Sequence, residues 1–171
     1  EMPFVVEGSN LVYEMEGRQI EITQDQIDTI NNYILSDNSY LKTEVINSLP
    51  VGIKADIYLA TTNNDTITKN ELYTSSNKVN SSSVIEINGS DGEAISSENK
   101  FILGDNNGEE GLLTKIEDAV KSRQNIFIGF KFKLGDVDSD EFIAGEKTYS
   151  FSDDQNIDTK AHLGITVKVN Q

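Results

Sequence analysis

The composition of this 171-residue chain excludes much of enzyme chemistry before any motif is considered, because the chain has no Cys, no Trp and a single His. Most catalysis at neutral pH uses a His, a Cys or a tuned carboxylate, so the catalytic inventory is small. The 29 Asp and Glu residues outnumber the 14 Lys and Arg residues, and a formal charge of −15 without a basic stripe excludes nucleic acid as the expected partner.

Length and targeting signals bear on the compartment. The length fits one ordinary domain that folds without disulfides, and no segment approaches the roughly 18 apolar residues of a membrane span. The chain starts with Glu1, Met2 and Pro3, without the charged and apolar regions of a signal peptide, so an export signal is expected to be absent here or already removed. The lack of Cys, with the abundance of Asn, Ser and Thr over residues 61–83, favours an extracytoplasmic location, either periplasmic or at the cell surface.

Residues 1–38 are expected to hold short strands and one helix. Thr23 and Gln26 have the spacing of a capping box, which predicts that the helix begins there. Apolar residues then recur at helical intervals, at Ile27, Ile30 and Ile34. A boundary at 36–39 divides the chain into an N-terminal part, residues 1–38, and a core, residues 39–171. The N-terminal part is expected to pack on this core or to belong to the same domain. The short strands of the N-terminal part are expected at 4–6, 11–15 and 19–22.

The core of residues 39–171 is predicted to consist of strands, one long loop region and a second helix. Every second residue from Val51 to Leu59 is apolar, which is the pattern of a half-buried strand. Residues 61–83 are rich in Ser, Thr and Asn, which indicates a loop excursion around a short strand at 71–73. A second helix is predicted over 111–122, with one apolar face and with Lys and Arg at its end. Further short strands are expected at 40–46, 84–87, 101–103 and 148–151.

Two more alternating runs complete the fold prediction. They extend from Ile126 to Leu134 and from Leu163 to Val169. Antiparallel sheets produce this alternation, since one face of each strand is buried and the other is solvated. Roughly ten strands with two helices between them therefore predict a mainly β fold, an antiparallel β-sandwich with two short helical connections.

The best candidate for a metal site is the acidic loop after the strand that ends at Leu134. Asp136, Asp138 and Asp140 stand at alternate positions, so their oxygens can turn towards one hard cation such as calcium. The loop departs from an EF-hand, because Glu141 stands where Gly is required and Lys147 stands where the bidentate Glu belongs. The alternative is a solvated acidic hairpin loop.

Other single residues offer little catalytic chemistry. His162 shares the predicted exposed face of the last strand and is expected to be inert, and no Gly-x-Ser-x-Gly elbow places a nucleophile. Tyr58, on the outward side of a strong strand, is the first residue to inspect for a binding surface, although a Tyr that covers its cross-strand neighbours gives the same pattern. Glycoside hydrolysis needs only two carboxylates, which keeps a carboxylate-based hydrolase open.

One short segment carries a resemblance to a known family. Asn47 and Pro50, followed by the alternation from Val51 to Leu59, resemble the Asn-x-x-Pro step in immunoglobulin-like sandwich domains of the late-embryogenesis-abundant type and in related bacterial envelope proteins. Pro50 lacks a backbone donor and interrupts strand pairing at this step. The resemblance covers residues 47–59 and implies an immunoglobulin-like sandwich with a structural or binding role.

These observations predict a protein that is not an enzyme. The expected function is that of a structural or adhesion-type β-sandwich module of a bacterial cell-envelope or surface protein, with other envelope or surface components as partners and no required cofactor. Two alternatives stay open. One is a calcium- or carbohydrate-binding module that uses Asp136, Asp138 and Asp140, and the other is the carboxylate-based hydrolase.

Overall fold

The computed structural model describes residues 2–5, 11–79, 85–90, 92–104, 111–135, 148–151 and 154–168. Within these ranges the chain forms ten strands, three α-helices and one short 3-10 helix, η1 (Ser75–Asn77). The helices are α1 (Gln24–Asn32), α2 (Lys69–Leu72) and α3 (Leu112–Lys121). The strands are β1 (Met2–Val5), β2 (Leu11–Glu14), β3 (Arg18–Gln19), β4 (Tyr40–Asn47), β5 (Gly52–Thr62), β6 (Ile85–Ile87), β7 (Ile95–Ile102), β8 (Asn125–Gly135), β9 (Thr148–Phe151) and β10 (Ile157–Gly164).

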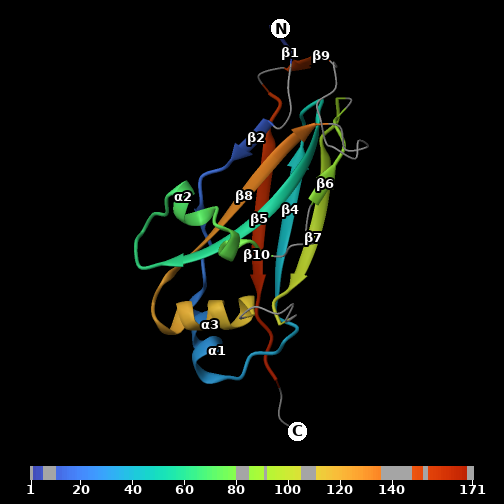
Figure 1. Cartoon of the computed structure of the whole chain (residues 1–171). Helices are drawn as coiled ribbons and strands as arrows, with labels where there is room; N and C mark the ends of the chain where they lie inside the picture. The colour runs from blue at the N-terminus through green and yellow to red at the C-terminus, as the bar shows by residue number, and fades with distance from the viewer. Residues whose placement is uncertain are drawn as a thin grey trace.

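Two antiparallel sheets form the body of the molecule (Figure 1). One has the strand order β10-β4-β7, and the other has the order β2-β8-β5-β6, with β3 also paired to β8. The β5–β8 ladder is the longest and runs from the pair Gly52↔Gly135 to the pair Thr62↔Asn125. Strands β1 and β9 pair with each other in a separate two-stranded ladder. The predicted fold class, an antiparallel β-sandwich with short helices, is confirmed.

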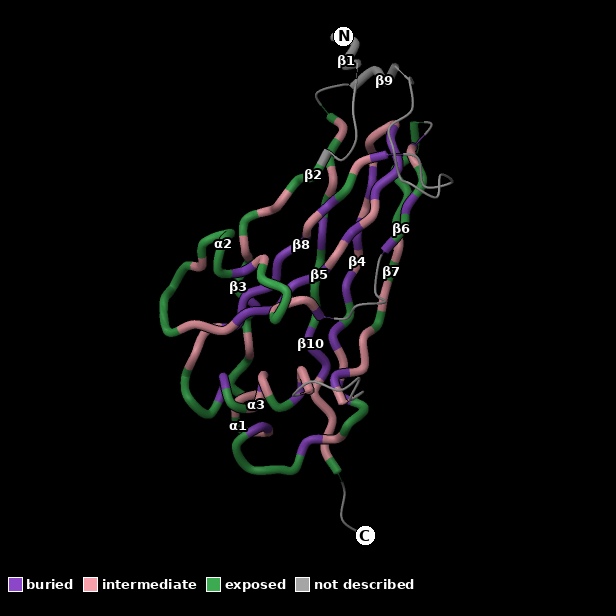
Figure 2. Tube along the Cα trace, viewed as in Figure 1, coloured by how far each residue is buried: buried purple, intermediate pink, exposed green. Residues whose placement is uncertain are grey.

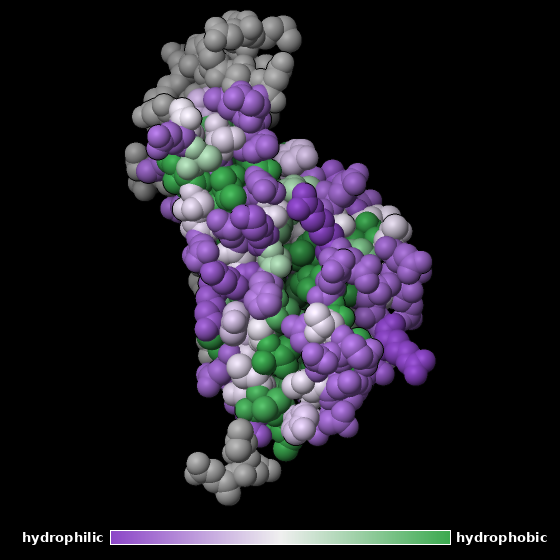
Figure 3. All heavy atoms as spheres, turned by 180° about the vertical axis from the view of Figure 1, so that it is seen from behind, coloured by the Kyte–Doolittle hydropathy of each residue, from purple (hydrophilic) through white to green (hydrophobic). Residues whose placement is uncertain are grey.

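The core lies between the two sheets, as the buried stretches of β4, β5 and β8 in Figure 2 show. In β5 the alternate residues Ile53, Ala55, Ile57 and Leu59 are all buried, as the alternation predicts. Their partners on β8 include Phe132, which is the largest fully buried side chain. Seen from behind, in Figure 3, hydrophilic residues cover most of the surface and flank a strip of hydrophobic residues.

Helices α1 and α3 lie together at one end of the sandwich (Figure 1). The predicted capping box of α1 is present: the Gln26 amide N–H donates to Thr23 Oγ1, and the Thr23 N–H donates to Gln26 Oε1. Ile30 of α1 and Ile116 of α3 enter the same hydrophobic core as the sheets. Among the helices in the described part of the chain, none has the length and apolar character needed to cross a membrane.

Three predicted elements differ from the structure. The strand expected at 71–73 is wrong, because this segment belongs to α2, which has its own capping box between Thr68 and Glu71. Strand β7 begins at Ile95, well before the expected 101–103. The last strand is displaced: β10 ends at Gly164, and beyond it Val167 forms only an isolated bridge with Leu35. Burial of Ile165 and Val167 against the core explains their alternation without a ladder.

The step from β4 to β5 passes from one sheet to the other, and Asn47 holds it together. This side chain is fully buried, its Nδ2 donates to the carbonyls of Val51 (2.9 Å) and Asn88 (3.0 Å), and its Oδ1 accepts from the Leu49 N–H (3.1 Å). Gly89 packs so closely against Pro50 that a Cβ there would lie 2.3 Å from the Pro50 carbonyl oxygen. The Asn at the start of the step is therefore a satisfied buried amide with a structural task.

Candidate functional site

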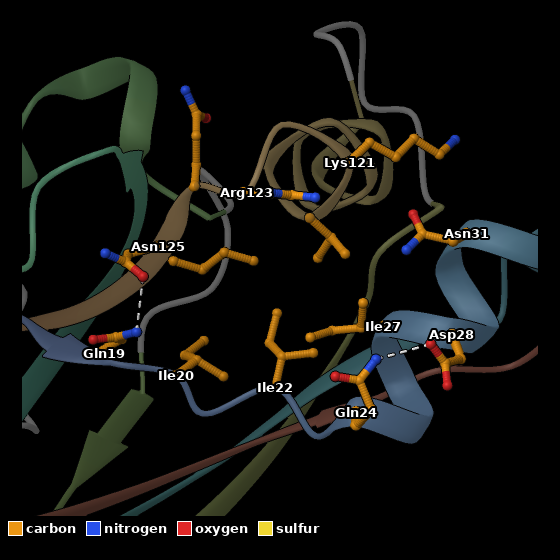
Figure 4. A pocket seen from close by; sticks show the side chains of 13 residues that line it. Gln19, Ile20, Ile22, Gln24, Ile27, Asp28, Asn31, Lys121, Arg123 and Asn125 are labelled. Carbon is orange, nitrogen blue, oxygen red and sulfur yellow. Dashed lines mark hydrogen bonds between the residues drawn. The ribbon is translucent and has the colours of Figure 1, made fainter.

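A groove opens at the helical end of the sandwich, between α1, α3, β3 and the start of β8 (Figure 4). Its volume of about 650 Å³ lies in the range of ligand sites. The lining consists of five aliphatic residues, five carboxamides and three charged residues. These are Ile20, Ile22, Ile27, Val120 and Ile126; Gln19, Gln24, Asn31, Gln124 and Asn125; and Asp28, Lys121 and Arg123. We refer to it as the α1–α3 groove.

One wall of the groove is a single face of α1. Gln24, Ile27, Asp28 and Asn31 follow one another at helical spacing, so they line up on one side of the helix. The cap at Thr23 fixes where the helix starts and therefore which face turns towards the groove. The sequence places two amides and one carboxylate along this wall.

The opposite wall is the C-terminal turn of α3. The Gln124 N–H donates to the Ala119 carbonyl (2.8 Å) and the Arg123 N–H donates to the Val120 carbonyl (3.1 Å), which together form a Schellman motif. In this motif the residue after the helix has a left-handed backbone conformation and is usually Gly. Here that residue is Arg123, with φ of 56°. An L-residue there is strained, so Arg123 has a backbone conformation that its own side chain disfavours.

Some polar groups of the groove are satisfied within it and others are free. Gln19 Nε2 donates to Asn125 Oδ1 (3.0 Å), and Gln24 Nε2 donates to Asp28 Oδ1 (2.8 Å), as the dashed lines in Figure 4 mark. The side chains of Asn31, Arg123 and Gln124 form no hydrogen bond or ion pair with the residues that the structure describes. The groove therefore presents open donors and acceptors above an aliphatic floor.

This arrangement supplies the chemistry of binding. Carboxamides donate and accept hydrogen bonds without a charge, and a guanidinium recognises carboxylates through paired N–H donors. Asp28 is the single carboxylate among the described lining residues, and its Oδ1 already accepts from Gln24. A pair of acids of the kind that glycoside hydrolysis uses is not present in that lining.

Two half-buried polar groups lie outside the groove and have structural partners. Lys115 Nζ donates to the Leu59 carbonyl (3.1 Å) and to Asn77 Oδ1 (2.8 Å), and burial lowers the pKa of this ammonium. The Tyr73 hydroxyl lies 2.7 Å from the Met15 carbonyl and 2.9 Å from the Phe130 carbonyl, and burial raises the pKa of this phenol. Both side chains tie the excursion after β5 to the sandwich.

The residues predicted to hold a metal, Asp136, Asp138 and Asp140, lie outside the described residues. In the part of the chain that is described, no three His, Asp or Glu side chains come together in a group suited to a metal ion. The calcium site therefore stays a prediction from the sequence.

The other two predicted candidates have different outcomes. His162 is exposed on β10 as expected, directly opposite Lys42 on β4, with its ring 6.4 Å from that of Tyr40. Tyr58 lies on the outward side of β5, as the alternation predicts, but it does not form an open binding surface. It is 7% exposed, because α2 covers it and the Tyr73 ring packs edge-on against it at 5.0 Å.

Sequence reasoning did not identify the residues of the groove. In the sequence pattern Arg123 is simply a cation at the end of a predicted helix, and nothing in that pattern distinguishes Asn31. One usable signal exists, since a helix that ends without Gly at its left-handed position and continues at once into a strand is unusual. The rest could not be found, because the groove combines two stretches of chain, 19–31 and 120–126, that are far apart in the sequence.

Comparisons with known proteins add no relative. No protein-family model matches the chain, and no curated protein or solved structure shows a significant similarity to it. The functional argument therefore depends on the groove and on the surfaces of the two sheets.

Proposed function

We propose that this chain is a non-catalytic, structural or adhesion-type β-sandwich module of a bacterial cell-envelope or surface protein, and that the α1–α3 groove is its contact site. The groove carries the proposal, because it combines an aliphatic floor with amides and a guanidinium that have no partner among the described residues. The small catalytic inventory, with one His and no Cys, supports binding over turnover.

The outer face of the three-stranded sheet supports the same proposal, because it differs from the groove in having paired charges. On the three-stranded sheet Lys42 pairs with Glu98 (2.9 Å) and Lys160 pairs with Glu44 (2.9 Å), so the charges there are matched across strands. Matched charges leave little unsatisfied hydrogen-bonding capacity for a partner. The groove, by contrast, is lined by Asn31, Arg123 and Gln124, whose side chains have no hydrogen-bond or ion-pair partner in the described part of the chain.

An adhesion assay tests the proposal. Beads coated with the protein are incubated with fixed bacterial cells and with isolated cell envelopes, and bound beads are counted. We expect binding that falls at least about tenfold for the double variant Asn31→Ala/Gln124→Ala, which loses two amides without losing a hydrogen bond or ion pair to any described residue. The matched control is Lys133→Gln, an exposed residue of β8 outside the groove, which should bind as the parent protein does.

A turnover panel of glycosides, esters and peptides completes the test. We expect no hydrolysis. Specific hydrolysis that Asp28→Asn abolishes would contradict the proposal and favour a carboxylate-based hydrolase. Bead binding that both the double variant and the control retain would place adhesion outside the groove.

A further inference from the structure

Arg123 stands apart among the cations of the protein. Of the Lys and Arg side chains that the structure describes, all but Arg123 and Lys133 have a carboxylate, carbonyl, amide or aromatic partner. The chain has 29 acids for 14 bases, so a cation without any partner among the described residues is unexpected. Lys133 is an exposed residue of β8 outside the groove, whereas Arg123 lines the α1–α3 groove.

The backbone at Arg123 strengthens this observation. Its φ of 56° is the conformation that Gly adopts without cost, and Gly at this position would stabilise the end of α3. Arg at this position adds nothing to the described structure, because its guanidinium has no partner there. What it does provide is a charged group with five N–H donors at the groove, at the end of α3 and opposite the α1 wall that holds Asn31 (Figure 4).

The remaining lining defines what else a ligand carries. The floor of Ile20, Ile22 and Ile27 lies between the two polar walls (Figure 4), and it matches aliphatic side chains. The free amides of Asn31 and Gln124 match backbone N–H and C=O groups. None of the described lining residues is aromatic, so a sugar ring would find no flat apolar platform.

We propose that the α1–α3 groove binds a short extended peptide segment of a partner protein, in which one carboxylate, flanked by aliphatic side chains, pairs with Arg123. This inference rests on the proposed binding function of the same groove. The overall charge of −15 repels a segment with many acids, which limits the ligand to a single carboxylate near the guanidinium.

The test uses two fluorescein-labelled hexapeptide pools and one carbohydrate. The first pool has a fixed central Glu with Ile, Leu or Val on either side, the second has Gln in place of Glu, and the carbohydrate is oligogalacturonate. Anisotropy titrations should give an affinity for the Glu pool roughly tenfold higher than for the Gln pool, as expected for one charge-assisted pair. Oligogalacturonate should not bind.

Variants separate recognition from folding. Arg123→Gly should lose the preference for Glu over Gln while its Tm rises by about 2–4 °C, because the left-handed strain is removed. Lys133→Gln, which changes the other described cation without a partner, should keep the preference. Equal affinity for both pools, no binding of either pool, or an unchanged preference in Arg123→Gly would overturn the inference.

The oligogalacturonate titration distinguishes a failure of the peptide inference from a failure of the proposed binding function. Binding of oligogalacturonate without binding of the Glu pool would replace the peptide by an acidic glycan and leave the groove as the contact site. If Asn31→Ala/Gln124→Ala loses bead adhesion while the parent protein binds the Glu and Gln pools equally, the groove is still the contact site. The ligand then has no carboxylate that pairs with Arg123.

Discussion

The outer faces of the two sheets have the same alternating pattern but end up in different surroundings. On the five-stranded sheet, Tyr58 and Ala60 pack with Leu72 of α2 into a second hydrophobic cluster outside the main core. On the three-stranded sheet, the outward residues include the ion pairs Lys42–Glu98 and Lys160–Glu44, and Lys100 lies over the ring of Tyr40 at 4.1 Å. One outer face is covered and the other is open to solvent.

The difference originates in the segment of chain that comes after each strand. β5 leads into the excursion that folds back as α2, and Gly129 lets Leu72 approach β8 so closely that a Cβ at Gly129 would lie 2.4 Å from Leu72 Cδ2. Gly164 on β10 has a similar role on the open face, but there the atoms nearest to a Cβ would be those of the ring of its partner Tyr40. A sheet face is therefore solvent-exposed or buried according to the next segment of chain.

The largest expected effect is on the cluster beneath α2. Leu72 is 0% exposed, so Leu72→Ala should lower the free energy of unfolding by about 2–5 kcal/mol through lost burial and a residual cavity. Urea unfolding monitored by circular dichroism measures this. A loss below about 1 kcal/mol would mean that α2 is not part of the cooperative fold and that both outer faces are effectively open.

Tyr73→Phe should have a smaller effect on the same face. It removes the hydroxyl between the Met15 and Phe130 carbonyls but keeps the ring against Tyr58. Phe130 retains the Met15 N–H as a donor, so one acceptor is left without a protein donor and about 1 kcal/mol is lost. The control is Tyr33→Phe, since Tyr33 is 62% exposed. Equal stability losses for the two variants would contradict the covered-face description.

The open face should tolerate change. Lys42→Gln breaks the 2.9 Å ion pair between Lys42 and Glu98, and both of these side chains are well exposed. The variant should therefore lower the free energy of unfolding by less than about 1 kcal/mol, and in about 1 M NaCl it should be as stable as the parent protein. Lys131→Gln is the matched variant on the covered face, where the pair with Glu14 at 2.7 Å is less exposed and its hydrogen bond raises the pKa of Lys131. A loss for Lys42→Gln larger than that for Lys131→Gln would reverse the comparison.

The range of the interactions decides how much of this was predictable. Local patterns predicted β5, β8 and α1, since alternation and the Thr23 cap act within a few residues. They predicted Tyr58 on the outward side of β5 but not its burial, because α2 reaches it from elsewhere. The groove depends on how α1 and α3 meet, which no local pattern encodes. The missed local signal is the capping box at Thr68 and Glu71, which has the same spacing as the one that located α1.

These two boxes lead to the smallest expected effect, one that appears only as the pH is lowered. The α1 box uses neutral Gln26, whereas the α2 box uses Glu71, whose pKa is lowered from its ordinary 4.5 first by the hydrogen bond with the Thr68 hydroxyl and then by that with the Thr68 N–H. When the pKa of a carboxyl is lower in the folded state than in the unfolded state, the ionised carboxyl stabilises the fold at any pH above the unfolded-state pKa. That stabilisation is lost as the pH falls through the folded-state pKa. The cap of α2 should therefore weaken below pH 4.5, the ordinary value for this carboxyl, and that of α1 should not.

Amide NMR titration of Thr68 and Thr23 from neutral pH to well below the ordinary Glu pKa measures this difference. The Thr68 amide resonance should shift as the cap opens, while the Thr23 resonance stays constant through the same range. Glu71→Gln should remove the shift at Thr68, because a neutral carboxamide accepts the same N–H at any pH, as Gln26 does in α1. If the shift persists in Glu71→Gln, another acid controls the segment over the covered face, and the titrating cap is not what holds α2 there.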